Sequence, residues 1–256
     1  MLAVLLCGCN KVVTVELNDV APTIVIEGNV TDEPGPYYVL VSRTVNYSAP
    51  SEFSPVSGAM VRLTDSTNGV TELLREVDSG VYQTTDMGGV PLHTFQLAVA
   101  VGGQEYTASS TMPKQVALDS VTLADNINLA NQQGENAVAN FQDPAGVRNY
   151  YQFAEILNGR LLPDIFVFED RLSDGRYIRE ALFNDSNYLQ RGDTLTVTMS
   201  CVDVNVYNYF LTLGAVSDNG SGPQTATPSN PLSNISNGAL GYFSAHTSEA
   251  RTLIVR

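Results

Sequence analysis

The sequence predicts an all-β protein, in which one β-sandwich is followed by a second β-sandwich-like domain that carries one helix. Charged residues make up only 16% of the 256 residues, which is more typical of β-rich envelope proteins than of helical cytosolic ones. Short stretches in which apolar and polar residues alternate recur along most of the chain. Residues that favour turns separate these stretches at short, even intervals, as in β-sandwiches.

The first part of the chain, residues 21–113, is expected to form the N-terminal sandwich. Asn68-Gly69 and Gly102-Gly103 stand between alternating stretches, where two-residue hairpin turns need positive φ angles. The strands expected in this part are 23–31, 37–42, 59–64 and 95–101.

The second part, residues 114–256, is expected to form another β-rich domain. Thr111–Lys114 marks the boundary, so we expect two domains that meet near residues 112–117, with no sheet running continuously from one to the other. The strands expected here are 117–123, 137–142, 150–157, 165–168, 178–183 and 194–202, with two closing strands at 238–246 and 252–255.

One helix is predicted near residues 203–216. Asp203 can cap its N-terminus, and Val204, Tyr207 and Leu211 follow at the spacing of one helix face, which we expect to pack on a sheet. Cys201 ends the alternating strand before the helix and is expected to be a buried, unreactive thiol.

The first residues predict export and a lipid anchor. Met1–Cys9 is an apolar run too short to span a bilayer and looks like the tail of an export signal, so residues 1–8 are interpreted as a signal remnant. Leu6–Cys9 resembles a lipobox, where bacteria attach lipid to a cysteine. Residues 9–20 would then be a lipidated Cys9 and a polar tether, anchored in the outer membrane of a Gram-negative bacterium. The alternative is an ordinary apolar N-terminus, for example a buried strand.

The net charge of −14 limits the possible partners. An acidic surface repels phosphate groups, so we expect no nucleic-acid binding and no electrostatic adhesion to an anionic membrane. Attachment to a membrane would therefore depend on the lipid at Cys9.

The sequence contains no recognisable catalytic motif. The two histidines, His93 and His246, lack partners at metal-binding spacing, and the nucleophile-elbow and phosphate-loop patterns are absent. Ser244 and His246 share one strand face, but two residues do not make a triad. We therefore expect no catalytic residue, no metal and no cofactor.

Carboxylates that cluster after residue 168 allow two interpretations. Paired acids are used in glycoside hydrolysis and in calcium binding. Interleaved arginines favour a solvated, salt-bridged hairpin instead. The acids are Glu169, Asp170, Asp174 and Asp185, and the arginines are Arg171, Arg176 and Arg179.

The long segment Asp218–Asn234 is a candidate recognition loop. Its three prolines reduce the entropy lost on docking, and its uncharged polar groups can form hydrogen bonds. Aromatic residues that follow it would supply an apolar anchor. The alternative is a packed cover over the second sandwich, with Phe243 in the core. The candidate binding residues are Pro228, Asn230, Asn234, Tyr242, Phe243 and His246.

The chain resembles domain of unknown function 4249, a family of Bacteroidota outer-membrane lipoproteins. The resemblance rests on the lipobox-like cysteine and on segments spread over the chain. The first half also resembles the immunoglobulin-like, prealbumin-type sandwiches of carboxypeptidase accessory domains. The family resemblance implies neighbouring TonB-dependent transporters of the nutrient-import type. The segments are 24–32, 34–36, 55–59, 111–113, 143–151, 225–235 and 238–246.

Three functions from different classes remain open at this point. The first is a non-catalytic binding or accessory module that serves a TonB-dependent nutrient transporter. The second is an exported hydrolase whose site is built from scattered residues. The third is a structural or adhesive surface protein.

The lipobox interpretation predicts that Cys9→Ala releases the exported protein from the membrane. One acyl chain binds membranes only marginally, whereas a diacylglyceryl group with an N-acyl chain attaches stably. Cys7→Ala is the matched control, because Cys7 would leave with the signal. Fractionation of cells that express the full gene measures the effect. A Cys9→Ala protein that remains in the membrane fraction would show that the lipobox interpretation is wrong.

Overall fold

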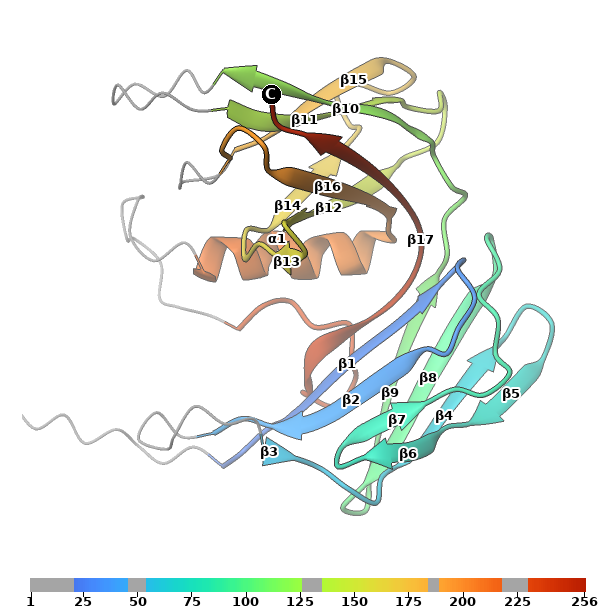
Figure 1. Ribbon diagram of the computed structural model, residues 1–256. Coiled ribbons are helices and arrows are strands. Elements are labelled where there is room, and N and C mark those ends of the chain that lie inside the picture. The colour runs from blue at the N-terminus through green and yellow to red at the C-terminus, as the bar shows by residue number, and fades with distance from the viewer. Residues whose placement is uncertain (1–20, 46–53, 126–134, 184–188, 218–229) are drawn as a thin grey trace, which may run out of the picture.

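The computed structural model describes residues 21–45, 54–125, 135–183, 189–217 and 230–256. It confirms the all-β fold, in which three sheets build two sandwiches that follow one another along the molecule (Figure 1). Cys9, the tether up to residue 20, Asp185 and Pro228 lie outside the described residues.

The N-terminal sandwich encloses the first of two main apolar cores. One of its sheets contains β1 (Ile24–Thr31), β2 (Tyr38–Arg43), β3 (Ser54–Pro55), β6 (Arg75–Asp78) and β7 (Val81–Gln83). The facing sheet has the order β5-β4-β8-β9, with β4 (Met60–Asp65), β5 (Val70–Leu73), β8 (Thr94–Val101) and β9 (Gln104–Thr111). Alternation along β1 and β8 directs Ile26 and Phe95 into the shared core.

The two glycine-containing turns of this sandwich differ. Gly102 and Gly103 both have positive φ angles and join β8 to β9, as the sequence predicts. The β4–β5 loop is longer than the predicted two-residue turn, and only Gly69 in it has a positive φ.

The second sandwich encloses a separate apolar core. Its smaller sheet contains β10 (Leu118–Asp125), β11 (Glu135–Gln142) and β15 (Tyr177–Leu182). Facing it are β12 (Tyr150–Leu157), β13 (Arg160–Leu161), β14 (Phe166–Glu169), β16 (Thr194–Cys201) and β17 (Leu240–Ile254). Cys201 is buried in this core, as predicted, and burial raises the pKa of its thiol.

The last strand, β17, belongs to both sandwiches. Its first half pairs in parallel with β1, from Val25 opposite Leu240 to Thr31 opposite His246. Its second half pairs antiparallel with β16, from Cys201 opposite Thr247 to Thr194 opposite Ile254. One ten-stranded sheet therefore runs through both halves of the molecule (Figure 1).

This strand corrects two expectations from the sequence. The expectation that no sheet crosses the boundary is wrong, because residues 240–246 add a strand to the N-terminal sheet. The two expected closing strands form one, because the polar residues between them continue the hydrogen-bonded ladder with β16. The division into domains at residues 113 and 114 stays a prediction.

The parallel pairing requires glycine at position 241. Gly241 has a φ of +91°, and a Cβ there would lie 2.1 Å from the carbonyl oxygen of Ile26. Any side chain would thus push β17 away from β1, besides occupying a left-handed backbone region.

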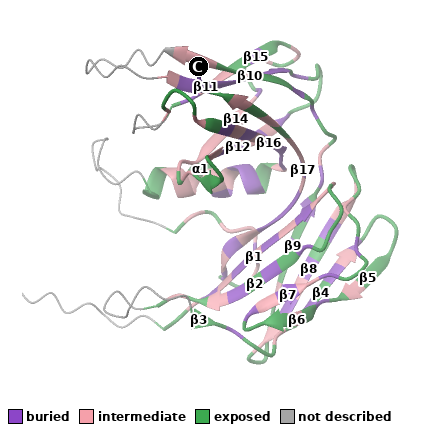
Figure 2. Cartoon of the chain, in the orientation of Figure 1, coloured by how far each residue is buried: buried purple, intermediate pink, exposed green. Residues whose placement is uncertain are grey.

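The helix α1 (Val204–Ser217) begins where the sequence predicts. Asp203 caps it, because its Oδ1 accepts hydrogen bonds from the backbone N–H groups of Asn205 (2.8 Å) and Val206 (3.1 Å). The predicted buried stripe is correct only at Tyr207, since Val204 and Leu211 are exposed. The buried face instead carries Val206, Tyr207 and Tyr209. Figure 2 shows that α1 has buried as well as exposed residues along its length.

The helix packs against β12, β14 and β17. Among the described residues, no helix has the length and apolar character needed to cross a membrane.

Candidate functional site

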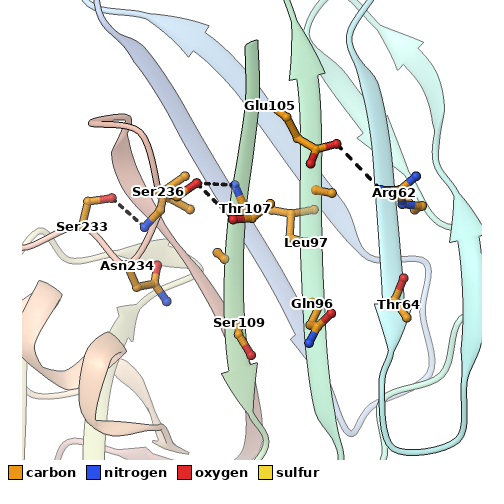
Figure 3. A pocket seen from close by; sticks show the side chains of 13 residues that line it. Arg62, Thr64, Gln96, Leu97, Glu105, Thr107, Ser109, Ser233, Asn234 and Ser236 are labelled. Carbon is orange, nitrogen blue, oxygen red and sulfur yellow. Dashed lines mark hydrogen bonds and ion pairs between the residues drawn. The ribbon is translucent and has the colours of Figure 1, made fainter.

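A polar groove of about 600 Å³ lies on the outer face of the β5-β4-β8-β9 sheet. Alternation leaves Arg62, Thr64, Gln96 and Ser109 outside the core, so that they form its floor (Figure 3). Hydroxyl and amide groups dominate the lining, and the facing charges of Arg62 and Glu105 form an exposed ion pair of 3.8 Å.

Residues 233–237 form one wall of the groove and dock on the free edge of β9. They include the end of the predicted recognition loop, Asp218–Asn234, whose residues 218–229 lie outside the described residues. The backbone N–H of Ser236 donates to the carbonyl of Thr107 (2.8 Å), and the N–H of Thr107 donates to the Ser236 hydroxyl (2.8 Å). Asn237 donates its side-chain amide to the carbonyl of Glu105 (2.6 Å). Residues 233–237 therefore cover a sheet edge that would otherwise be open.

Asn234 lines the groove and also binds the backbone of β17. Its Oδ1 accepts from the N–H of Phe243 (2.9 Å), and its Nδ2 donates to the carbonyl of Phe243 (2.7 Å). This amide thus pairs with β17 as a neighbouring strand would. Ile235 beside it is buried in the N-terminal core. Over residues 233–237 the segment is a packed cover, as the alternative from the sequence expected, but it covers the N-terminal sandwich and not the second one.

Phe243 has no surface to offer a ligand. It is 0% exposed and lies in the N-terminal core, so the expectation that it contributes to a recognition surface is wrong. The physical reason is its place on β17, whose alternation sends Phe243 and Ala245 inward against β1 and the facing sheet.

Tyr242 points the other way and joins the sheet to the helix. Its ring centroid lies 4.9 Å from that of Tyr209 and 4.9 Å from that of Phe210, both on α1. Its hydroxyl accepts a hydrogen bond from the Asn29 side chain (3.2 Å). Burial raises the pKa of Tyr242, and the residue acts as packing between two elements.

The pair of Ser244 and His246 lacks the geometry of a nucleophile and its base. The Ser244 hydroxyl lies 2.9 Å from Nδ1 of His246, whereas a triad serine contacts Nε2 and leaves Nδ1 to a carboxylate. Ser244 is also only 1% exposed, so a substrate has no access to its hydroxyl. Burial lowers the pKa of His246 from its ordinary value of 6.5 to about 4, although the charge of Asp32 opposes the shift.

His93 has a structural partner. Its Nδ1 lies 2.6 Å from Oδ2 of the buried Asp65, whose Oδ1 accepts from the N–H of Thr67 (3.0 Å). These contacts hold the loop after β4 against the start of β8. His93 therefore has a structural role.

Of the predicted binding residues that the structure describes, Asn234 alone lines the groove. Asn230 is exposed, and Tyr242 and His246 pack elsewhere along β17. The groove residues Arg62, Gln96 and Ser109 were missed, because in the sequence they look like any exposed strand position. The alternating pattern shows that they face outward, but only the strand register shows that they are neighbours.

The comparison with protein families identifies the chain. The family described as "Domain of unknown function (DUF4249)" matches residues 10–252, which is most of the chain. The chain belongs to this family. No curated protein matches it. The matched residues cover both sandwiches, so they include the groove, the helix and most of β17.

The environment of His246 predicts a loss of stability in mild acid. A histidine with a lower pKa in the folded state than in the unfolded state takes up its proton on unfolding. Its contribution is therefore fully present above pH 6.5 and is lost as the pH falls toward 4. In His246→Asn, unfolding in urea should depend less on pH over this range than in the wild type. Parallel stability profiles of the two proteins would contradict this assignment.

Proposed function

We propose that this protein is a non-catalytic binding module, anchored at Cys9 in the outer membrane, that serves a TonB-dependent nutrient transporter. The observation that carries the proposal is the polar groove on the β5-β4-β8-β9 sheet. The proposal further rests on the chemistry of the described residues and on what the family resemblance implies.

The groove has the properties of a recognition surface. Its floor is a hydrogen-bonded sheet, so the positions of its side chains are fixed before a partner arrives. Hydroxyl and amide groups fix orientation by hydrogen bonding without the cost of burying a charge. Among the lining residues that the structure describes there is no aromatic ring, which favours a polar protein surface over a stacked sugar ring.

The described residues also favour binding over turnover. The buried Ser244 and His246 lack the atom pairing that acyl transfer requires, and His93 holds a loop through Asp65. The described residues that line the groove include one carboxylate, that of Glu105, whereas glycoside hydrolysis requires two flanking the scissile bond.

The partner and the location follow from the N-terminus and the family. Lipid at Cys9 would keep the protein at the membrane despite its net charge of −14. Transporters of the nutrient-import type are the neighbours that the family resemblance implies. A protein tethered next to such a transporter has a high effective concentration there, so even a weak groove contact can persist.

Ser109→Trp tests the groove. Ser109 is exposed on β9, so the larger ring fills the groove while the sheet is retained. We expect the amount of transporter that co-purifies from native outer membranes to fall about tenfold or more, as for a blocked interface centre. The melting temperature should change by about 2 °C or less, as for a surface substitution.

Ser120→Trp is the matched control, because Ser120 is an exposed serine on β10, outside the groove. It should leave co-purification unchanged. If Ser109→Trp and Ser120→Trp retain the transporter equally, or if the wild type retains none, the proposed function is wrong.

A further inference from the structure

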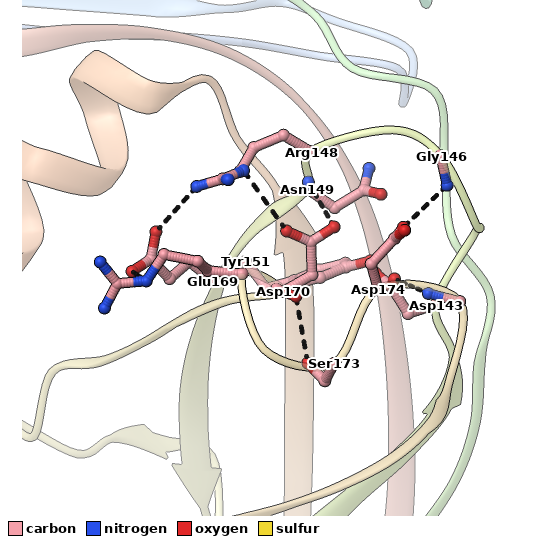
Figure 4. A network of polar contacts seen from close by, with 11 residues as sticks. Asp143, Gly146, Arg148, Asn149, Tyr151, Glu169, Asp170, Ser173 and Asp174 are labelled. Atoms are coloured by element: carbon pink, nitrogen blue, oxygen red, sulfur yellow. Dashed lines mark hydrogen bonds and ion pairs between the residues drawn. The ribbon is translucent and has the colours of Figure 1, made fainter.

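Two loops meet at one end of the second sandwich and bring three carboxylates together. Asp143 follows β11, while Asp170 and Asp174 lie in the loop between β14 and β15. One oxygen from each carboxylate lies within 4.8 Å of the others, and Figure 4 shows the three side chains side by side.

Each carboxylate is held in place by its neighbours. The N–H of Gly175 donates to Oδ2 of Asp143 (2.9 Å), and the hydroxyl of Tyr151 donates to Oδ1 of Asp143 (2.5 Å). The N–H of Gly146 donates to Oδ1 of Asp174 (2.7 Å). Every oxygen has a second lone pair, so these contacts orient the carboxylates and leave them able to bind a cation.

The negative charge of this cluster is only partly balanced. Asp143 and Asp170 are each 1% exposed, so water screens them poorly. Arg148 places its Nε 4.0 Å from Oδ1 of Asp170 and is the one cation paired with the cluster among the described residues. Burial raises the pKa of Asp170, and the charges of Asp143 and Asp174 act in the same direction.

The sequence predicts a salt-bridged hairpin, but among its described acids only Glu169 pairs with one of the interleaved arginines. Arg171 pairs with Glu169 at 3.4 Å, and Arg148 also reaches Glu169 at 3.7 Å. Within the described parts of the chain, neither Arg176 nor Arg179 forms an ion pair with Asp170 or Asp174.

Asn149 supplies a second and independent indication of a ligand. It is 8% exposed, and its Oδ1 is buried without a hydrogen-bond partner among the described residues. Its backbone N–H donates to Oδ2 of Asp170 (2.9 Å), so Asn149 is in direct contact with the cluster, and Figure 4 draws its side chain together with those of Asp170 and Asp174. An unpaired buried carbonyl is costly, and a bound cation would supply its missing partner.

We propose that Asp143, Asp170, Asp174 and the side-chain oxygen of Asn149 bind one calcium ion. The donor set consists of oxygens alone, which suits a hard cation. Calcium binds oxygens at about 2.3–2.6 Å, so ligands on opposite sides lie roughly 5 Å apart, in agreement with the 4.8 Å limit of this cluster. Water would complete the coordination shell. Magnesium usually keeps several waters and is held by one or two carboxylates, whereas this cluster offers three carboxylates.

The ion would tie the loop before β12 to the loop after β14. Asp143 and Asn149 lie at either end of the first loop, and Asp170 and Asp174 lie in the second. Because Tyr151 of the second core donates to Asp143, the ion would also stabilise the end of that core.

The test is calorimetric titration of calcium chloride into the full chain after removal of metal with a chelator. We expect one ion per chain and a higher melting temperature in calcium. Asp174→Asn and Asn149→Leu should each weaken binding about tenfold or more. Asn149→Leu should not destabilise the metal-free protein, because it removes an unpaired polar group from a buried position.

Asp119→Asn is the control for charge. Asp119 is exposed on β10, so this change removes one negative charge and should leave calcium binding unchanged. Absence of saturable calcium binding by the wild type would overturn the proposal. So would equal binding by Asp174→Asn, or an equal rise in melting temperature with sodium chloride at the same ionic strength. Equal affinity for magnesium would overturn the assignment to calcium.

Discussion

The pairing of β17 with two different strands determines how the rest of the molecule is arranged. Residues 240–246 pair with β1, which begins the described chain, and residues 247–254 pair with β16. Polar contacts reinforce the point where the strand passes from one partner to the other. The backbone N–H of Ser248 donates to the carboxylate of Asp32 (2.9 Å). The backbone N–H of Ala245 donates to the hydroxyl of Ser110 (2.8 Å). This hydroxyl in turn donates to Asp203, which caps the helix. Two apolar cores are thereby joined by one continuous ladder of backbone hydrogen bonds.

The groove and the proposed calcium site both depend on β17, the groove directly and the calcium site through the second core. The groove lies on the N-terminal sandwich, and the segment that forms its wall leads directly into β17 through Asn234 and Phe243. The proposed calcium site lies at the far sandwich, where Tyr151 connects it to the second core. Movement of β17 would therefore affect the groove first and the acidic cluster only through the second core. A module that must present a fixed polar face to a partner gains from this rigidity.

Local chemistry explains which parts of the structure the sequence predicts. Three predicted features each depend on a few neighbouring residues, so their patterns are visible in the sequence. They are the cap at Asp203, the turn at Gly102-Gly103 and the burial of Cys201. The passage of β17 between sheets depends on parallel pairing between residues more than 200 positions apart. Its polar middle, which includes the buried Thr247, breaks the apolar alternation that marks a strand.

The sites follow the same rule. Asp170 and Asp174 were recognised as a pair because they are close in sequence, but Asp143 and Asn149 join them only through tertiary contact. Likewise, Ser109 and Arg62 become neighbours through the register of β4, β8 and β9. Tyr242 and Phe243 suggested an aromatic surface, but adjacent residues on a strand face opposite sides. One packs on α1 and the other fills the core.

The central claim is that β17 couples the two sandwiches, and hydrogen exchange in Gly241→Ala tests it most directly. The new Cβ would meet the Ile26 carbonyl, so the change should destabilise the β1–β17 pairing by roughly 2 kcal/mol or more. Gly102→Ala is the control, because Gly102 also has a positive φ, of +59°, but no atom within 4 Å of the new Cβ. Coupling predicts that protection falls in β12 and β16 of the second sandwich as well as in β1 and β2. Loss of protection confined to β1, β2 and the first half of β17 would contradict the account.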